Sequence, residues 1–168
     1  RMNALIEGLL AYSRIGRAAG SLETVDVGLL VREVVDSLDP PRGFRVKLGP
    51  ELPVLRTDRL HLSQVFANLI ANAIRHHDRD EGLVTVCGRE EGERWVFSVT
   101  DDGPGIPLEF RHKIFLMFQT LAVKDYGVNT GIGLALVKKL VEEHGGTIYV
   151  EDADLGQDGR RGCRFVFS

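Results

Sequence analysis

The sequence predicts an α+β fold, a two-layer sandwich in which helices cover a sheet. Strand-like segments follow one another across turns, as at residues 83–89 and 94–101, and helical segments stand in separate blocks. A doubly wound sheet would instead require strands and helices to alternate regularly. The length of 168 residues and the hydrophobic content of 43% indicate one sizeable core with a short appendage.

The appendage is an amphipathic helix over residues 1–17, followed by a hinge at Gly16, Gly20 and Ser21. Its apolar stripe has three-four spacing and is formed by Met2, Leu5, Leu9 and Tyr12. About two heptads are too few to distinguish a helix that docks on its own domain from part of a coiled coil, so both interpretations stay open. We divide the chain into residues 1–19 and a main domain of residues 20–168.

Hydrophobic periodicity and turn residues set the elements of the main domain. Apolar residues at helical spacing predict helices over residues 27–38, 59–77 and 131–144, with a short helix after Pro107. Apolar runs, alternating or continuous, predict strands near residues 45–48, 53–55, 83–89, 94–101, 147–151 and 161–167. A charged turn joins two of these strands at residues 90–93, and a polar loop covers residues 119–130.

The composition excludes several kinds of partner. The chain has 21 basic and 24 acidic residues and no basic run, which argues against binding to nucleic acid. No apolar stretch approaches the roughly 20 residues of a membrane span, so we expect no membrane contact. Cys87 and Cys163 lie in apolar strand-like segments and are expected to be core thiols of a cytoplasmic protein. Because the chain starts at Arg1, we expect a piece of a longer protein, soluble or membrane-anchored.

A stripe of carboxamides runs along the long helix of residues 59–77. Gln64, Asn68 and Asn72 recur every four residues and therefore share one face. Such a stripe is either a solvated face or a source of oxygen ligands for magnesium, which prefers oxygen donors and keeps phosphates in its shell. Arg75, one turn further on, is placed to contact a phosphate.

A carboxylate ends the alternating strand of residues 94–101. Asp101 falls on the same face as the apolar side chains of this strand, where an unpaired charge would be costly. An adenine amino group is a suitable donor to it, and Gly103 and Gly105 allow the backbone to approach a flat ring. The alternative is that Asp101 and Asp102 only shape a turn.

A glycine-containing loop, Asn129 to Leu134, opens the helix of residues 131–144. The free amides of a helix N-terminus attract phosphate, and Gly131 and Gly133 permit close contact. The loop has neither the lysine of a Walker loop nor the third glycine of a dinucleotide fingerprint. Capping or packing is the alternative interpretation.

The helix ends and the histidines are interpreted as structural. Thr130 is expected to cap the N-terminus of the helix of residues 131–144, and His144 to end it before a glycine C-cap. His76 and His77 are interpreted as a solvated helix end. No Cys/His spacing predicts a zinc site.

Taken in order, these sites resemble the catalytic domain of sensor histidine kinases, within the wider ATPase group of gyrase, Hsp90 and MutL. The resemblance covers roughly residues 24–168 and depends on four boxes of sequence. They are the asparagine box QVFANLIANAIR at 64–75, the glycine box DDGPGI at 101–106, the phenylalanine box IFLMF at 114–118 and the second glycine box TGIGLA at 130–135. The segments at 8–14 and 118–133 further resemble phytochrome-like kinases.

The resemblance implies a mixed sheet packed by about three helices, with ATP bound between the two layers. It implies that Asp101 holds adenine, that Asn72 binds Mg²⁺ and that Asn68, as the catalytic residue, lies near the phosphates with Arg75. The other implied nucleotide-binding residues are Gly103, Gly105, Ile106, Phe118, Lys124, Thr130, Gly131, Ile132, Gly133 and Leu134. Residues 119–130 would form a lid over the phosphates.

The resemblance also implies a function, the transfer of the ATP γ-phosphate to a histidine on a dimerisation helix. Residues 1–19 would be the end of such a helix with its linker, and residues 20–168 the catalytic domain. No histidine of the chain is followed by the acidic, basic and proline residues of the acceptor motif, so autophosphorylation of this chain alone is not expected. The implied partners are the phosphoacceptor-histidine helical domain of the same protein, in a homodimeric parent, and a response regulator receiver domain.

Two departures from the family pattern support an alternative. Asp102 stands where the family usually has asparagine, and Asn129 where it usually has glycine. A chain weakened in nucleotide binding by these changes would be a non-catalytic dimer or docking module of the same fold. An ATP-hydrolysing clamp is disfavoured, because its relatives carry a glutamate as general base where this chain has Asn68.

Overall fold

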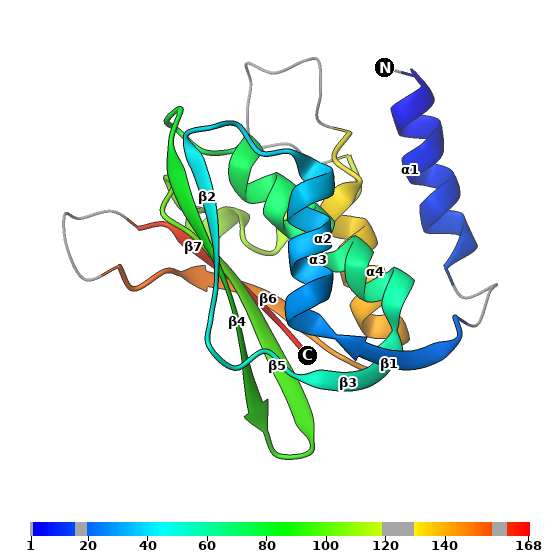
Figure 1. The fold of residues 1–168 in the computed structure, drawn as a ribbon. Helices are drawn as coiled ribbons and strands as arrows, with labels where there is room; N and C mark the ends of the chain where they lie inside the picture. Colours follow the sequence, from blue (N-terminus) through cyan, green and yellow to red (C-terminus); the bar gives the residue numbers. More distant parts are fainter. Residues whose placement is uncertain (1, 16–19, 119–129, 156–160) are drawn as a thin grey trace.

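The computed structural model describes residues 2–15, 20–118, 130–155 and 161–168. Figure 1 shows two layers, with a twisted sheet on one side and helices α2, α3 and α4 packed against one of its faces. Helix α1 lies further out, beside α4. The predicted α+β sandwich is therefore confirmed.

The helices are α1 (Met2–Arg14), α2 (Val27–Leu38), α3 (Arg59–Arg75) and α4 (Gly133–Glu143). Aspartates cap two of them: Asp26 accepts a hydrogen bond from the Leu29 N–H, and Asp58 accepts one from the His61 N–H. The short helix predicted after Pro107 consists of two 3₁₀ turns, Leu108–Phe110 and Lys113–Phe115. Among the described helices, none combines the length and apolarity needed to cross a bilayer.

The main sheet has five strands in the order β2-β4-β5-β7-β6. Their bounds are β2 (Phe44–Leu48), β4 (Gly82–Glu91), β5 (Arg94–Asp101), β6 (Ile148–Asp152) and β7 (Cys163–Phe167). The pair β2 and β4 is parallel and the other pairs are antiparallel, so the sheet is mixed, as the resemblance implies. A separate antiparallel pair joins β1 (Leu22–Asp26), which the sequence did not predict, to β3 (Val54–Asp58).

The core lies between the sheet and helices α2, α3 and α4. Phe66 of α3 is fully buried and makes edge-to-face contacts with Phe97 of β5 and Phe167 of β7, at centroid distances of 5.7 and 5.4 Å. In β5 the buried residues alternate as predicted and end at Asp101. Because one side of α3 packs on the sheet, its carboxamide side is left to face the start of α4.

Helix α1 docks on its own chain through its second half. The Lys139 ammonium of α4 donates a hydrogen bond to the Tyr12 carbonyl oxygen at 2.9 Å and lies 4.2 Å from the centre of the Tyr12 ring. An apolar face of α1 nevertheless remains exposed, formed by Met2, Leu5, Ile6, Leu9 and Leu10. The expected hinge falls partly on residues 16–19, outside the described residues.

Two local expectations were wrong. Thr130 does not cap α4, because the helix starts at Gly133 and its N-cap position is held by Ile132, without a side-chain cap. His77 is not part of a solvated helix end: only 1% of its side chain is exposed, and its Nε2 lies 3.0 Å from Asp102 Oδ1. The chain turns back after α3 and covers this ring, which helical periodicity alone does not show. At the other end of α4, His144 is the C-cap and Gly145 follows with φ +72°, as expected.

Candidate active site

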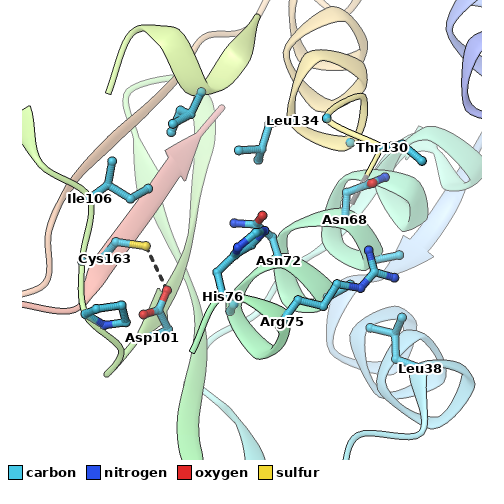
Figure 2. A pocket seen from close by; sticks show the side chains of 18 residues that line it. Leu38, Asn68, Asn72, Arg75, His76, Asp101, Ile106, Thr130, Leu134 and Cys163 are labelled. Atoms are coloured by element: carbon cyan, nitrogen blue, oxygen red, sulfur yellow. Dashed lines mark hydrogen bonds between the residues drawn. The ribbon is translucent and has the colours of Figure 1, made fainter. Parts of the chain in front are cut away.

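A cavity of about 480 Å³ opens between α3, the end of β5 and the start of α4. Figure 2 shows Asp101 on the strand side and Asn68, Asn72 and Arg75 on the α3 side. Ten residues named from the sequence line the cavity: Asn68, Asn72, Arg75, Asp101, Gly105, Ile106, Thr130, Gly131, Gly133 and Leu134. Ile114 of the phenylalanine box lines it too, so the fold brings all four sequence-distant boxes to one place.

The carboxamide stripe of α3 is not simply solvated. The Asn68 Nδ2 donates a hydrogen bond to the Gln64 carbonyl oxygen at 2.8 Å, and this bond fixes the orientation of the side chain. Its Oδ1 points at the start of α4, since a Cβ added to Gly133 would lie 2.9 Å from that oxygen. Asn72, one turn further along, also lines the cavity. Amide oxygens of α3 thus face the glycine loop of α4.

The backbone at the start of α4 borders the cavity. No described side chain caps the helix, and Gly131 adopts φ +65°, a conformation that favours glycine. The Gly131 carbonyl oxygen accepts a hydrogen bond from the Phe118 N–H at 2.8 Å, which ties the loop to the segment before residue 119. An uncapped helix N-terminus beside a cavity is a site for an anion.

Asp101 is a buried carboxylate at the wall of the cavity, with 6% of the residue exposed. Its Oδ1 accepts a hydrogen bond from the Gly103 N–H and its Oδ2 accepts one from the Cys163 S–H, both at 2.9 Å. Burial raises the pKa of Asp101, and the two hydrogen bonds and the nearby His77 only partly oppose this effect.

Cys163 and His76 line the cavity although the sequence did not assign them to the site. Burial raises the pKa of the Cys163 thiol strongly, and the neighbouring Asp101 carboxyl raises it further, so the sulfur stays protonated and can donate. Cys163 was expected to be a core thiol, and it is buried, but it also lines the cavity and positions Asp101. Only the pairing of β5 with β7, which sets Asp101 opposite Cys163, brings the two together.

Asp102, the next residue, makes its bonds outside the cavity lining. Its Oδ1 accepts a hydrogen bond from the Leu83 N–H at 2.8 Å and contacts His77 Nε2, and its Oδ2 accepts one from Arg79 at 3.3 Å. Burial alone would raise the pKa of Asp102, but these donors together hold it below its ordinary value. Asp102 therefore fastens the segment after α3 to β4.

Three described residues named from the sequence do not line the cavity. Gly103 supplies the amide that binds Asp101 but does not line the cavity, and Phe118 is exposed. Ile132 is buried on the side of α1, with its side chain 3.5 Å from the position of a Cβ added to Gly8. Lys124 and most of the expected lid, like Asn129, fall outside the described residues.

The chain is similar to curated proteins along almost its whole length. The chain is 34% identical to the phytochrome-like protein Cph1 of Synechocystis over 170 residues, which cover 99% of this chain and 22% of that protein. It is 33% identical to the methanogenesis regulatory histidine kinase FilI of Methanothrix harundinacea, over 97% of this chain and 18% of that protein. The chain thus spans 22% or less of the length of these two relatives.

Solved structures show the same fold. Full-length ShkA in complex with AMPPNP matches with a TM-score of 0.78 and 29% identity, over 98% of this chain and 34% of that one. The catalytic domain of the histidine kinase ThkA matches with a TM-score of 0.67 and 27% identity, over 88% of this chain and 93% of that one. Residues 57–168 match the family described as histidine kinase-, DNA gyrase B-, and HSP90-like ATPase. The chain belongs to this family, as an ATP-binding domain of the sensor histidine kinase type.

Proposed function

We propose that the chain binds ATP with Mg²⁺ in the α3–β5–α4 cavity and presents the γ-phosphate to a histidine on a dimerisation helix of the same protein. The observation that carries the proposal is one cavity with a buried carboxylate at one wall and an uncapped helix N-terminus at another. The first suits a base with an exocyclic amino group, and the second suits phosphates.

The adenine end is formed by Asp101 and the turn that follows it. Each Asp101 oxygen accepts one hydrogen bond from the protein, and a carboxylate oxygen has a further lone pair for an amino group of the ligand. Gly105 adopts φ +76°, and its Cβ position is blocked by the Gly162 carbonyl at 2.8 Å, so a side chain is not tolerated beside the ring. Ile106 and Leu134 add apolar contact area to the cavity wall.

The phosphate end lies between Gly131, Gly133 and the α3 stripe. The Oδ1 of Asn68 occupies the space beside Gly133, so a side chain at position 133 would collide with it. Asn72 is the proposed Mg²⁺ ligand, since it is a neutral oxygen donor on the cavity wall. A bound Mg²⁺ would neutralise charge on the phosphates, and the protein's own part is to hold them in line with the acceptor.

Transfer to histidine is favoured over hydrolysis because residue 68 is an asparagine and not an acid. A hydrolysing relative needs a general base for water, and a carboxamide cannot take a proton. Asn68 is moreover held by the Gln64 carbonyl oxygen, which orients its Oδ1 toward the phosphate loop. Asn68 is therefore proposed to position the phosphates.

A non-catalytic docking module is the second candidate, and Asp102 was one of its two supports. The Asp102 carboxyl binds the Leu83 amide, His77 and Arg79 and does not line the cavity. Its replacement of the usual asparagine is thus compatible with nucleotide binding. The kinase proposal is favoured for this reason.

The test has two stages. Calorimetric titration with AMPPNP, with and without Mg²⁺, should show binding that Asp101→Asn greatly weakens and Asn72→Ala makes insensitive to Mg²⁺. The chain is then mixed with labelled ATP and the protein's own phosphoacceptor-histidine helical domain. Label on that domain, passed on to a response regulator receiver domain, supports the proposal. No binding at millimolar nucleotide would refute the kinase proposal and leave the docking module. Nucleotide binding without any label transfer would refute the proposed phosphoryl transfer.

A further inference from the structure

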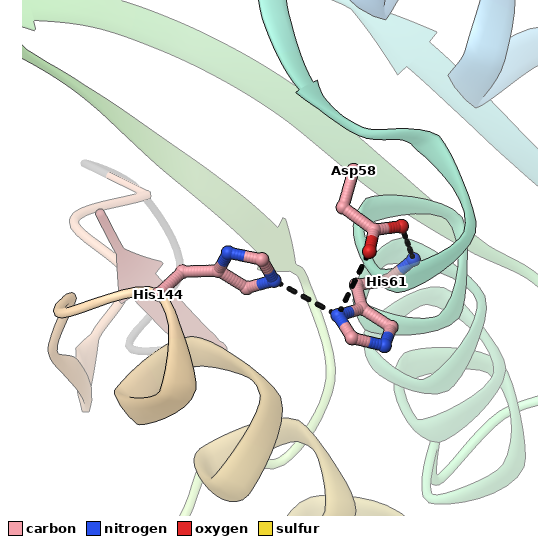
Figure 3. A group of neighbouring side chains, drawn as sticks. All are labelled: Asp58, His61 and His144. Carbon is pink, nitrogen blue, oxygen red and sulfur yellow. Dashed lines mark hydrogen bonds and ion pairs between the residues drawn. The ribbon is translucent and has the colours of Figure 1, made fainter. Parts of the chain in front are cut away.

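Three metal-ligating side chains meet at the end of the α3–α4 pair that is remote from the cavity. They are Asp58 at the end of β3, His61 in the first turn of α3 and His144 directly after α4 (Figure 3), and one ligand atom of each lies within 4.8 Å of the others. We propose that these residues form a binding site for a divalent transition metal ion, with Zn²⁺ as the best fit. Along α3, His61 lies roughly 16 Å from Asn72, so the site is separate from the nucleotide cavity.

The three facing atoms of Asp58, His61 and His144 have more acceptor lone pairs than there are protons between them. His61 Nδ1 lies 2.8 Å from His144 Nε2, in a hydrogen bond that needs one proton between the two nitrogens. The same Nδ1 lies 3.3 Å from Asp58 Oδ2, within reach of an ion pair. That oxygen is buried and nevertheless accepts no hydrogen bond from any described residue.

An unsatisfied buried carboxylate oxygen is the independent observation that points to a ligand. Only 4% of the Asp58 side chain is exposed, and its other oxygen, Oδ1, is used to cap α3 through the His61 N–H at 3.0 Å. A buried charged oxygen without a donor costs free energy, and native proteins rarely leave one. A cation between Oδ2 and the two ring nitrogens would satisfy all three atoms at once.

The type and spacing of the ligands favour zinc. Two imidazoles with one carboxylate are a ligand set that Zn²⁺ uses, with water in the fourth tetrahedral position. Ligand bonds of about 2.0–2.1 Å place tetrahedral ligand atoms roughly 3.3–3.4 Å apart. The 3.3 Å between His61 and Asp58 already matches, and the 2.8 Å between the two histidines must open by roughly half an ångström. His144 is exposed, so its ring can move and water can enter from its side.

The backbone around the cluster closes its other side. Gly20 lies directly over Asp58, and a Cβ at this glycine would collide with Oδ2. The ion would therefore join β3, the start of α3 and the end of α4 beside Gly20. Local spacing predicted no zinc site because the two histidines are 83 residues apart in the sequence.

The experiment titrates the untagged chain with Zn²⁺ by calorimetry, and with Co²⁺ by its visible absorption, which reports tetrahedral coordination. We expect one ion per chain, and at least tenfold weaker binding in His61→Ala and in His144→Asn. Asp58→Asn should also weaken binding, while asparagine keeps the helix cap. The matched control is His112→Ala, which removes an exposed histidine outside the cluster and should bind as the unchanged chain does.

Stability and nucleotide binding separate this proposal from the previous one. Zn²⁺ should raise the melting temperature of the unchanged chain and of His112→Ala but not of His144→Asn, since an ion that binds only the folded state stabilises it. Asp101→Asn should bind Zn²⁺ normally even when it fails to bind nucleotide. Equal Zn²⁺ affinity in all variants, or no tetrahedral Co²⁺ spectrum, would overturn the proposal and leave a hydrogen-bonded cluster.

Discussion

Replacing Asp101 by asparagine should separate stability from ligand binding. In the folded chain the pKa of Asp101 is raised, chiefly by burial, so its ionised form is disfavoured relative to the unfolded chain. Such a rise costs stability at neutral pH, because the carboxyl ionises more easily in the unfolded chain. The cost is absent below the unfolded pKa and is complete above the folded pKa. The free Asp101→Asn chain should therefore melt at the same or a higher temperature than the unchanged chain at pH 7.

The same substitution should damage nucleotide binding. Asp101 uses one oxygen for the Gly103 N–H and the other for the Cys163 S–H, and asparagine has only one oxygen. Keeping the Gly103 bond turns the new NH₂ group toward Cys163 and the cavity, where it opposes the amino group of adenine. Loss of a hydrogen bond to a charged group is worth about 1.5–3 kcal/mol, or roughly a 10- to 150-fold rise in Kd.

The assay is paired calorimetry and thermal melting of Asp101→Asn with AMPPNP and Mg²⁺. Asp102→Asn is the matched control, because this neighbouring aspartate makes its bonds outside the cavity and should bind nucleotide within about twofold of the unchanged chain. The affinity for AMPPNP should also fall as pH falls through the raised pKa of Asp101, because the carboxylate that accepts the hydrogen bond becomes protonated. An Asp101→Asn chain that binds AMPPNP as tightly as the control would refute the assigned role.

Further substitutions test the surroundings of the site. Asp102→Asn should lower the free energy of unfolding by about 1–3 kcal/mol at pH 7 in urea titrations. Since folding lowers the pKa of Asp102, this difference should shrink as pH falls below about 4, and a constant difference would contradict it. Gly133→Ala should displace the Asn68 side chain and weaken AMPPNP binding about tenfold, with little change in melting temperature. A large fall in melting temperature together with the loss of AMPPNP binding would indicate misfolding instead. Gly20→Ala should push Asp58 from its capping position and cost about 0.5–2 kcal/mol in urea titrations, and an unchanged midpoint would show that the linker can yield.

The sequence predicted those parts of the fold that depend on local pattern. Helix α2 was predicted over its observed range and β5 over its observed range, because their apolar residues repeat with the period of the element that they form. The long helix was predicted two residues too long, since His76 and His77 continue a helical pattern that the backbone does not follow. Strand β1 was missed: most of its residues are exposed, so it shows no clear apolar run, and it forms only by pairing with β3.

The sequence predicted which motifs form the site, but it did not predict the contacts between them. The glycines and amides were found because phosphate chemistry restricts residue types locally. The hydrogen bond from Cys163 to Asp101 spans 62 residues, and the contact between His61 and His144 spans 83. Such pairs depend on strand order and helix packing, which a single sequence does not specify.

The position of Ile132 has a mechanical consequence. Gly131 and Gly133 line the cavity with their backbone, while the residue between them is fully buried toward α1, against Gly8. A ligand that shifts this backbone would therefore also shift a branched side chain that packs against the first helix. A direct packing contact at Ile132 thus joins the wall of the cavity to α1, without intervening residues.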